Sequence, residues 1–302
     1  SEIAHRTAAY KEANPEKGAQ IIRLGIGDVT LPLGKVVIDA LHEGVEAMAS
    51  AETFKGYGPE QGYEETRNAI AAYYKKNGVE VDPGDIFVSD GAKSDTGNIT
   101  DLFGHDNIVL VPDPVYPVYV DTNIMAGNSV TYMAGNAENG FLPMPNKDQH
   151  ADVIYLCSPN NPTGALYPKE VLQQIVDLAR EHQLIIFSDE IYDRLVMDGK
   201  EHIALSSLAP DLLTVSFNGL SKSHLIAGYR CGWMVLCGEK KHAKGYIEGI
   251  NMLSSMRLCA NVLAQHVVAP ALKNRPDVDP LLLPGGRLYE QRKCICEAID
   301  GV

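Results

Sequence analysis

The sequence predicts an α/β protein built on a mostly parallel, seven-stranded sheet that is covered by helices. From residue 85 onward, short apolar runs alternate with longer segments of helical character. The apolar runs lack a clean two-residue alternation, which is typical of strands that are covered on both faces. Strands that alternate with helices favour parallel pairing, and ligands on such sheets bind at the carboxyl ends of the strands.

The chain is expected to begin with an arm and part of a small domain, residues 1–34, and to enter the sheet only after two further helices. The predicted helices are Ile3–Ala13, Lys35–Met48, Tyr63–Asn77, Pro168–His182 and Leu288–Ile299. The predicted strands are Asp85–Ser89, Asn107–Val111, Ser129–Met133, Val153–Cys157, Leu184–Ser188, Leu212–Phe217 and Gly232–Leu236. Between the second and third helices, Phe54–Tyr63 is dense in glycine and proline, which indicates a shaped loop.

Composition narrows the class of protein. The 302 residues, 45% hydrophobic and 22% charged, are typical of a globular protein with two domains, or one large domain with an appendage. A net charge of -13 argues against nucleic acid or an anionic membrane as partner. The chain has no apolar run of membrane-spanning length and no signal peptide at its first residues. Its six cysteines fit neither a zinc site nor a disulfide framework, so we expect no metal and a reducing cytoplasm.

Chemically useful side chains follow five of the predicted strands. These clusters are Ser89–Lys93, Asp113–Tyr119, Ser158–Gly164, Asp189–Tyr192 and the turn that contains Lys222. Gly91 opens a helix whose first N–H groups suit a phosphate. Tyr116 could stack on a flat ring, although tyrosine more often packs in a core, and Asp189 alone would suggest a helix N-cap. Five such clusters together predict a ligand site at one edge of the sheet.

The turn Asn218–His224 carries the sharpest signal. Lys222 stands among small residues just after an apolar strand, and Arg230 follows eight residues later. Most lysines are simply exposed surface residues. The alternative is a lysine that forms a Schiff base with pyridoxal phosphate, while Arg230 grips the phosphate with two donors.

In combination these motifs resemble fold-type I, pyridoxal-phosphate-dependent aminotransferases of class I/II. Residues 1 to about 164 resemble LL-diaminopimelate aminotransferases, and residues from about 165 are more similar to bacterial alanine aminotransferases, as in a natural mosaic or an engineered chimera. The first half carries this likeness in Leu24–Thr30, Gly56–Tyr63, Ser89–Lys93 and Asp113–Pro117. The second half carries it in Asp189–Asp193, Asn218–Lys222 and Lys241–Gly249.

The resemblance implies a role for each motif residue. Lys222 would hold the cofactor and shuttle the proton, and Asp189 would pair with the pyridine nitrogen, with Tyr192 as the third catalytic residue. The cofactor-binding set would be Gly91, Ala92, Lys93, Tyr116, Asn161, Asp189, Tyr192, Ser221, Lys222, Arg230 and, from a partner subunit, Tyr57. The substrate-binding set would be Ile26, Gly27, Glu60, Asn161 and Asn261, with Glu60 and Asn261 also supplied by the partner. The partners implied are an amino acid, a 2-oxo acid and a second copy of the chain in a homodimer.

The resemblance also implies a domain plan and a substrate. We expect a large cofactor-binding domain over 35–275 and the start of a truncated small domain over 276–302, without the arginine that holds the substrate α-carboxylate. Glu60 could meet the distal ammonium of LL-diaminopimelate, which favours an LL-diaminopimelate:2-oxoglutarate aminotransferase of lysine biosynthesis. The alternatives are an aminotransferase for alanine or a similar small amino acid, and a non-catalytic remnant that only binds the cofactor.

Overall fold

A computed structural model describes residues 2–22 and 27–299. The chain divides into two units, Ser1–Leu31 and Pro32–Val302. In the first unit, helices α1 (Glu2–Ala13) and α2 (Pro15–Ala19) pack closely where Gly18 meets Lys11. A Cβ atom on Gly18 would lie 2.8 Å from the Lys11 Cα atom, so only glycine allows this contact. The predicted domain boundary near residue 275 stays a prediction.

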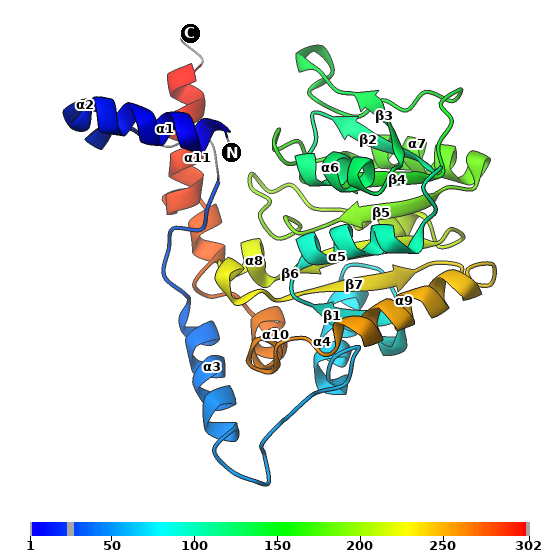
Figure 1. Cartoon of the computed structure of the whole chain (residues 1–302), viewed down its shortest axis with the longest axis horizontal. Coiled ribbons are helices and arrows are strands. Elements are labelled where there is room, and N and C mark those ends of the chain that lie inside the picture. Colours follow the sequence, from blue (N-terminus) through cyan, green and yellow to red (C-terminus); the bar gives the residue numbers. More distant parts are fainter. Residues whose placement is uncertain (1, 23–26, 300–302) are drawn as a thin grey trace. The chain divides into compact units, whose positions relative to one another are not determined.

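The second unit contains the predicted seven-stranded sheet (Figure 1). Its strands are β1 (Ile86–Ser89), β2 (Ile108–Asp113), β3 (Ser129–Ala134), β4 (Val153–Cys157), β5 (Ile185–Asp189), β6 (Thr214–Gly219) and β7 (Gly232–Cys237). They lie in the order β1-β7-β6-β5-β4-β2-β3. β2 to β6 pair in parallel, and β7 runs antiparallel to both β1 and β6. The predicted fold class is therefore confirmed, and every strand lies within two residues of its predicted bounds.

Helices cover both faces of the sheet, which explains why the strands are apolar on both sides. On one face α5 (Ala92–Asn98), α6 (Pro117–Met125) and α9 (Lys244–Arg257) share a core with alternate residues of the strands, such as Phe87 and Phe187. On the other face α4 (Glu64–Lys76), α7 (Lys169–His182) and α10 (Val262–Lys273) pack on the intervening residues, such as Ile186. Figure 1 shows α5 and α9 in front of the sheet and α7 behind it.

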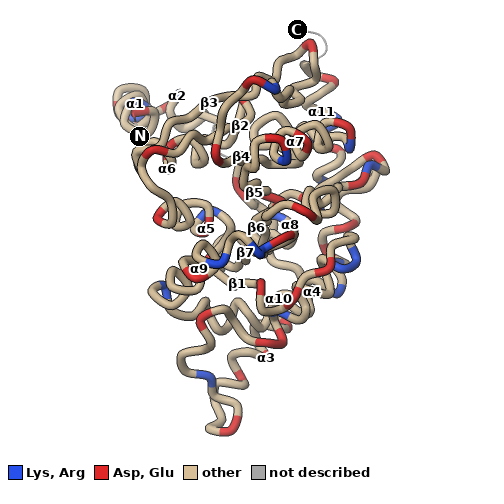
Figure 2. Tube along the Cα trace, turned by 90° about the vertical axis from the view of Figure 1, so that its right-hand side faces the viewer, with Lys and Arg blue, Asp and Glu red and all other residues tan. Residues whose placement is uncertain are grey.

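Two more helices complete the second unit. Helix α3 (Lys35–Ala47) packs against α10. Helix α11 (Arg287–Ile299) is the last element of the described chain. On α11, Arg292 makes a two-pronged ion pair with Asp198, with both N–O distances at 2.8 Å. Among the described residues, no helix is both long enough and apolar enough to cross a membrane. On the face that Figure 2 presents, Lys and Arg are scattered among Asp and Glu.

Candidate active site

The strand pairing brings the predicted site residues to one edge of the sheet. Cys157 at the end of β4 pairs with Asp189 at the end of β5, and Asp189 pairs with Phe217 near the end of β6. Gly219 at the end of β6 pairs with Gly232 at the start of antiparallel β7. The loops that follow β4, β5 and β6 and the loop that precedes β7 therefore emerge side by side.

The turn after β1 forms a cradle with Arg230. Gly91 has a φ of +121°, and a Cβ atom on it would lie 2.7 Å from the Arg230 Nη2 atom. A Cβ atom on Gly232 would lie 2.5 Å from the Gly91 Cα atom. Both positions require glycine, because any side chain would displace the guanidinium group or the turn itself. Buried Ala92 begins α5 here, so backbone N–H groups and a guanidinium group gather at one place.

A buried ion pair between Asp95 and Arg257 supports this cradle. The Ser89 Oγ atom receives a hydrogen bond from the Gly91 N–H, at 3.2 Å, and donates to the Asp95 Oδ2 atom, at 2.5 Å. The Arg257 Nη1 atom, on α9, lies 2.9 Å from the Asp95 Oδ1 atom. Burial raises the pKa of the Asp95 carboxyl to about 6, against the opposing effect of Arg257. Sequence reasoning missed both Asp95 and Arg257.

Asp189 is a buried carboxylate that has no ion-pair partner in the described part of the chain. Its residue is 7% exposed, and none of the ion pairs found in 2–22 and 27–299 includes it. The Tyr119 hydroxyl donates a hydrogen bond to Oδ2, at 2.5 Å, and the Ile191 N–H donates to Oδ1, at 3.1 Å. Burial raises the pKa of the Asp189 carboxyl to about 6, although the bond from Tyr119 lowers it. A bound cation beside Asp189 would relieve this cost of burial.

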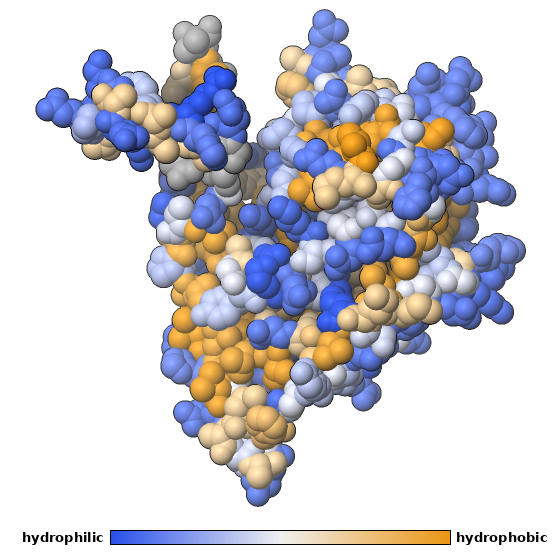
Figure 3. Space-filling view, viewed as in Figure 1, coloured by the Kyte–Doolittle hydropathy of each residue, from blue (hydrophilic) through white to orange (hydrophobic). Residues whose placement is uncertain are grey.

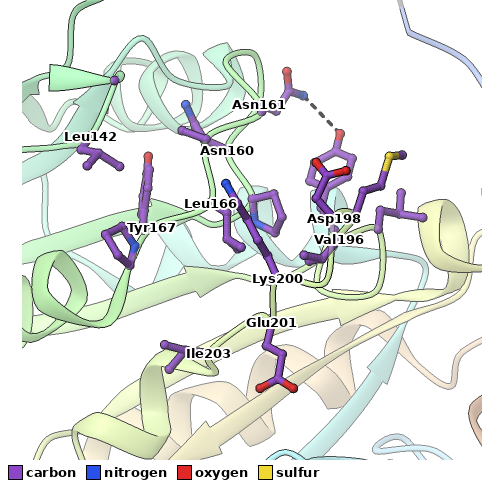
Figure 4. A pocket seen from close by; sticks show the side chains of 18 of the residues that line it. Leu142, Asn160, Asn161, Leu166, Tyr167, Val196, Asp198, Lys200, Glu201 and Ile203 are labelled. Carbon is purple, nitrogen blue, oxygen red and sulfur yellow. Dashed lines mark hydrogen bonds between the residues drawn. The ribbon is translucent and has the colours of Figure 1, made fainter. Parts of the chain in front are cut away.

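Asn161 and Tyr192 point toward one another across the same edge. The Asn161 Nδ2 atom donates to the Tyr192 hydroxyl, at 3.3 Å, as the dashed line in Figure 4 marks. Burial, then the neighbouring Cys157 and Asp189, raise the pKa of Tyr192 to about 12, so its hydroxyl stays protonated at neutral pH. Both residues line an open cavity of about 930 Å³ that extends past Leu166 and Lys200.

Lys222 lies in the four-residue helix α8 (Leu220–Ser223), directly after β6. Lys222 is half-buried. The turn before it is tight, because a Cβ atom on Gly219 would lie 2.6 Å from the Cys231 carbonyl oxygen. Throughout the described ranges, its ammonium group has neither a hydrogen bond nor an ion pair. Ser221 beside it is buried. A free amine thus stands at the edge that Asp189 also occupies.

The remaining predicted site residues are less concentrated. Tyr116 is half-buried and meets the Tyr119 ring edge-on, with centroids 5.7 Å apart, and Lys93 is exposed on α5. Tyr57 is 89% exposed. The Asn261 Oδ1 atom caps α10 by accepting from the Ala264 N–H at 2.9 Å, a structural use that the sequence reasoning did not anticipate.

Glu60 is bound to α9 of its own chain. Its Oε1 atom accepts from the Ser255 hydroxyl at 2.8 Å, and its carbonyl oxygen accepts from the Ser254 hydroxyl at 2.9 Å. Gly27 is exposed in the first unit, and Ile26 lies outside the described residues. The structure therefore brings the predicted lysine, aspartate, asparagine, tyrosine and arginine to one edge of the sheet. The residues predicted to come from a partner subunit, Tyr57, Glu60 and Asn261, are exposed and lie in other parts of the sequence.

Comparison with known proteins accounts for this arrangement. The profile of the family described as "Aminotransferase class I and II" matches residues 19–293. The chain belongs to this family. It is an aminotransferase of the fold-type I class, as the sequence predicted, and it acts on an amino acid and a 2-oxo acid. Its cofactor is pyridoxal 5′-phosphate, which the sequence also predicted.

Individual relatives differ in their named activity. The chain is 41% identical over 308 residues to the glutamate-pyruvate aminotransferase AlaA of Escherichia coli, covering 98% of this chain and 75% of that protein. It is 45% identical over 258 residues to the LL-diaminopimelate aminotransferase of Lachnospira eligens, covering 79% of this chain and 63% of that protein. The solved alanine aminotransferase of Pyrococcus furiosus is 28% identical with a TM-score of 0.86, covering 98% of this chain and 76% of that chain. The predicted mosaic of two halves stays a prediction.

The edge residues of the aminotransferase fit its cofactor. The glycine cradle beside Arg230 matches a phosphate dianion. The buried, unpaired Asp189 carboxylate matches a protonated ring nitrogen, and Asn161 with Tyr192 matches a ring oxygen. The free Lys222 amine matches the aldehyde. These matches come from the turn after β1, from the ends of β4 and β5, and from the segment between β6 and β7, which carries both Lys222 and Arg230.

Proposed function

We propose that this aminotransferase moves an amino group between alanine, or a similar small amino acid, and a 2-oxo acid, with pyruvate and glutamate as the other members of the exchange. The observation that carries the proposal is the extent of the likeness: the 41% identity to AlaA extends over 98% of this chain, whereas the 45% identity to the LL-diaminopimelate enzyme extends over 79% of it. The Glu60 side chain, which would meet the distal ammonium of LL-diaminopimelate, accepts a hydrogen bond from Ser255 through one of its two oxygens.

The site residues have the following proposed roles. Arg230 and the first N–H groups of α5 hold the phosphate, Asp189 binds the ring nitrogen, and Asn161 and Tyr192 bind the ring oxygen. Lys222 would hold the cofactor, and its amine, once released, would take the proton from the substrate Cα atom. When bound, pyridoxal phosphate supplies an electron sink for the electron pair left at Cα. The negative charge of Asp189 would favour the protonated form of the ring nitrogen.

The position of Lys222 suits proton transfer. Its amine takes part in no ion pair among the described residues, so it is free to act as a base once it is released from the cofactor. The hydroxyl of Tyr192 stays protonated because burial raises its pKa to about 12, so it acts as a hydrogen-bond donor. Asn161 fixes the direction of that hydroxyl at 3.3 Å.

LL-diaminopimelate is the second candidate substrate, because the LL-diaminopimelate aminotransferase of Lachnospira eligens is 45% identical to this chain over 258 residues. Single-turnover mixing distinguishes the two. The cofactor-loaded protein is mixed with alanine, glutamate or LL-diaminopimelate, and the loss of its visible absorbance is followed. We expect alanine and glutamate to react at least tenfold faster than LL-diaminopimelate. The reverse order, with Glu60→Gln selectively slowing LL-diaminopimelate, would establish the second candidate instead. Reaction with none of them would favour a non-catalytic remnant.

We also propose a homodimer in a reducing compartment such as the cytoplasm. Apolar residues are exposed on α3 and the loop that follows it, including Val45, Phe54 and Tyr57. Figure 3 shows hydrophobic side chains gathered over this part of the molecule. A contiguous exposed apolar surface of this kind is typical of a protein interface. All six cysteines are free, which supports a reducing location.

A further inference from the structure

The helix that carries Lys222 cannot hold its own position. Helix α8 has only four residues, and a helix of that length has too few internal hydrogen bonds to be stable without tertiary contacts. The orientation of Lys222 relative to Asp189 and Tyr192 must therefore be set by groups outside α8. Those groups are found where the segments after β5 and β6 meet the end of α10.

One buried arginine contacts both segments. Arg275 follows α10 and is 7% exposed. Its Nη1 atom donates to the carbonyl oxygen of Ser223, the residue after Lys222, at 3.0 Å. Its Nη2 atom donates at 2.8 Å to the carbonyl oxygen of Arg194, which lies two residues beyond Tyr192. The two prongs of one guanidinium group thus span the backbones that carry Lys222 and Tyr192.

A second contact from α10 secures the same turn. The His224 Nε2–H donates to the Ala271 carbonyl oxygen at 2.8 Å, and the His224 Nδ1 atom lies 2.8 Å from the Ser223 hydroxyl. Burial lowers the pKa of His224 to about 3, so the ring is neutral and its Nδ1 atom accepts from Ser223. The end of α10 and the residues after it therefore contact the turn of Lys222 in two ways: Ala271 binds the His224 side chain, and Arg275 binds the Ser223 carbonyl oxygen.

An independent bond ties the two segments directly. The Asn218 Nδ2 atom donates to the Asp193 Oδ2 atom at 2.8 Å, and the Asn218 Oδ1 atom accepts from the Gly219 N–H at 2.7 Å. The Tyr73 hydroxyl donates to the same Asp193 oxygen. Asp193 anchors the strand end from which α8 begins, so Arg275 has to orient only the short turn itself.

The buried guanidinium group of Arg275 carries a desolvation cost, so stability alone does not explain an arginine at this position. Its buried Nε atom has no hydrogen-bond partner among the residues that the structure describes, and burial and the nearby Arg194 lower the pKa of its guanidinium group. Its ion-pair partner Asp279 is half exposed. Buried ion pairs can often be replaced as a whole by apolar residues without loss of stability. The feature that only arginine supplies here is a rigid fork that reaches two carbonyl oxygens at once.

We propose that Arg275 is a positioning residue that fixes Lys222 relative to Asp189 and Tyr192. This inference rests on the proposed function, because it assumes that Lys222 holds the cofactor. Arg275 donates to two backbone carbonyl oxygens, so we assign it no contact with the cofactor or the substrate. It acts through the Ser223 backbone, and its removal should alter the geometry of the bound cofactor more than the affinity for the amino acid.

The test compares Arg275→Lys and Arg275→Gln with Asp279→Asn. The lysine keeps the charge and the glutamine leaves no buried charge, but neither has two separate donor nitrogens to replace Nη1 and Nη2. Asp279→Asn removes the ion-pair partner and leaves both carbonyl bonds in place, so it is the matched control. Each protein, loaded with pyridoxal phosphate, is measured for visible circular dichroism, for kcat and KM with the amino acid that the parent turns over, and for thermal midpoint.

We expect both Arg275 variants to change the visible circular dichroism of the bound cofactor and to lose at least tenfold in kcat, with KM within threefold of the parent. Asp279→Asn should match the parent within twofold in kcat. Parent-like dichroism and kcat in a folded Arg275 variant would overturn the inference, and so would an equal loss in Asp279→Asn. Peptide mapping of the reduced parent separates the two failures: a label away from Lys222 rejects the proposed function, whereas a label on Lys222 with unchanged Arg275 variants rejects this inference alone.

Discussion

At the scale of single residues, Asp189 links protein stability to cofactor binding. Burial raises the pKa of its carboxyl from 3.8 to about 6, so the fold favours the protonated form. The stability that this group contributes is complete below pH 3.8 and is lost as the pH rises through 6. At neutral pH, the cofactor-free protein therefore carries a buried carboxylate at a cost, and a cationic ring nitrogen would offset that cost.

Asp189→Asn removes this cost from the cofactor-free protein. We expect the variant to be more stable than the parent by about 1–3 kcal/mol at pH 8, with the difference shrinking as the pH falls through 6. In the loaded protein the advantage should disappear, and turnover should fall severely. Urea unfolding with and without pyridoxal phosphate at several pH values measures both effects. Exposed Asp101→Asn is the control, and a cofactor-free Asp189→Asn less stable than the parent at pH 8 would count against this reading.

At the scale of elements, the strands were predictable because each is a short apolar run between polar segments. Four helices of the second unit, α6, α8, α9 and α10, were not predicted, and the two longest of them were missed for local reasons. Helix α9 contains Gly245 and Gly249, and α10 contains Pro270. Glycine and proline both argue against a helix in sequence reasoning. Packing against neighbouring helices and strands overrides these local preferences, and no sequence pattern reports that packing.

The site shows the same division between local and long-range information. Lys222, Asp189 and Asn161 were found because each lies at a strand end or a few residues after one. The contacts that support them were not, since Tyr119 and Asp189 are 70 residues apart and Arg257 and Asp95 are 162 apart. No spacing rule connects residues at such separations. Asn261 matched a site position, yet its side chain caps a helix, because asparagine is also a favoured N-cap residue.

The Asp95–Arg257 pair joins α5 to α9 and should stabilise the phosphate cradle. Arg257→Met leaves a buried carboxylate, so we expect it to cost about 3 kcal/mol at pH 8, and less at pH 5.5 where Asp95 takes up a proton. Adding Asp95→Asn should recover part of this loss. Urea unfolding of the two single variants and the double variant gives the coupling energy. Strictly additive losses would mean that the pair does not act as a unit.

At the scale of the whole molecule, the proposed homodimer makes a prediction about the loop that contains Tyr57. We expect sedimentation velocity to give a dimer, and Tyr57→Arg together with Phe54→Arg to shift it toward monomer, because charge replaces exposed apolar surface. Tyr10→Arg, at an exposed aromatic residue in the first unit, is the control. A parent that sediments as a monomer while binding one cofactor per chain and turning over would contradict the proposal.

The central claim is that the strand-end cluster holds pyridoxal phosphate on Lys222. The most direct measurement reduces the cofactor-loaded protein with borohydride and maps the labelled peptide by mass spectrometry. We predict the pyridoxyl label on Lys222, and no visible absorbance band in Lys222→Ala. A label on Lys93, which is exposed at the start of α5, or on any other lysine would contradict the account.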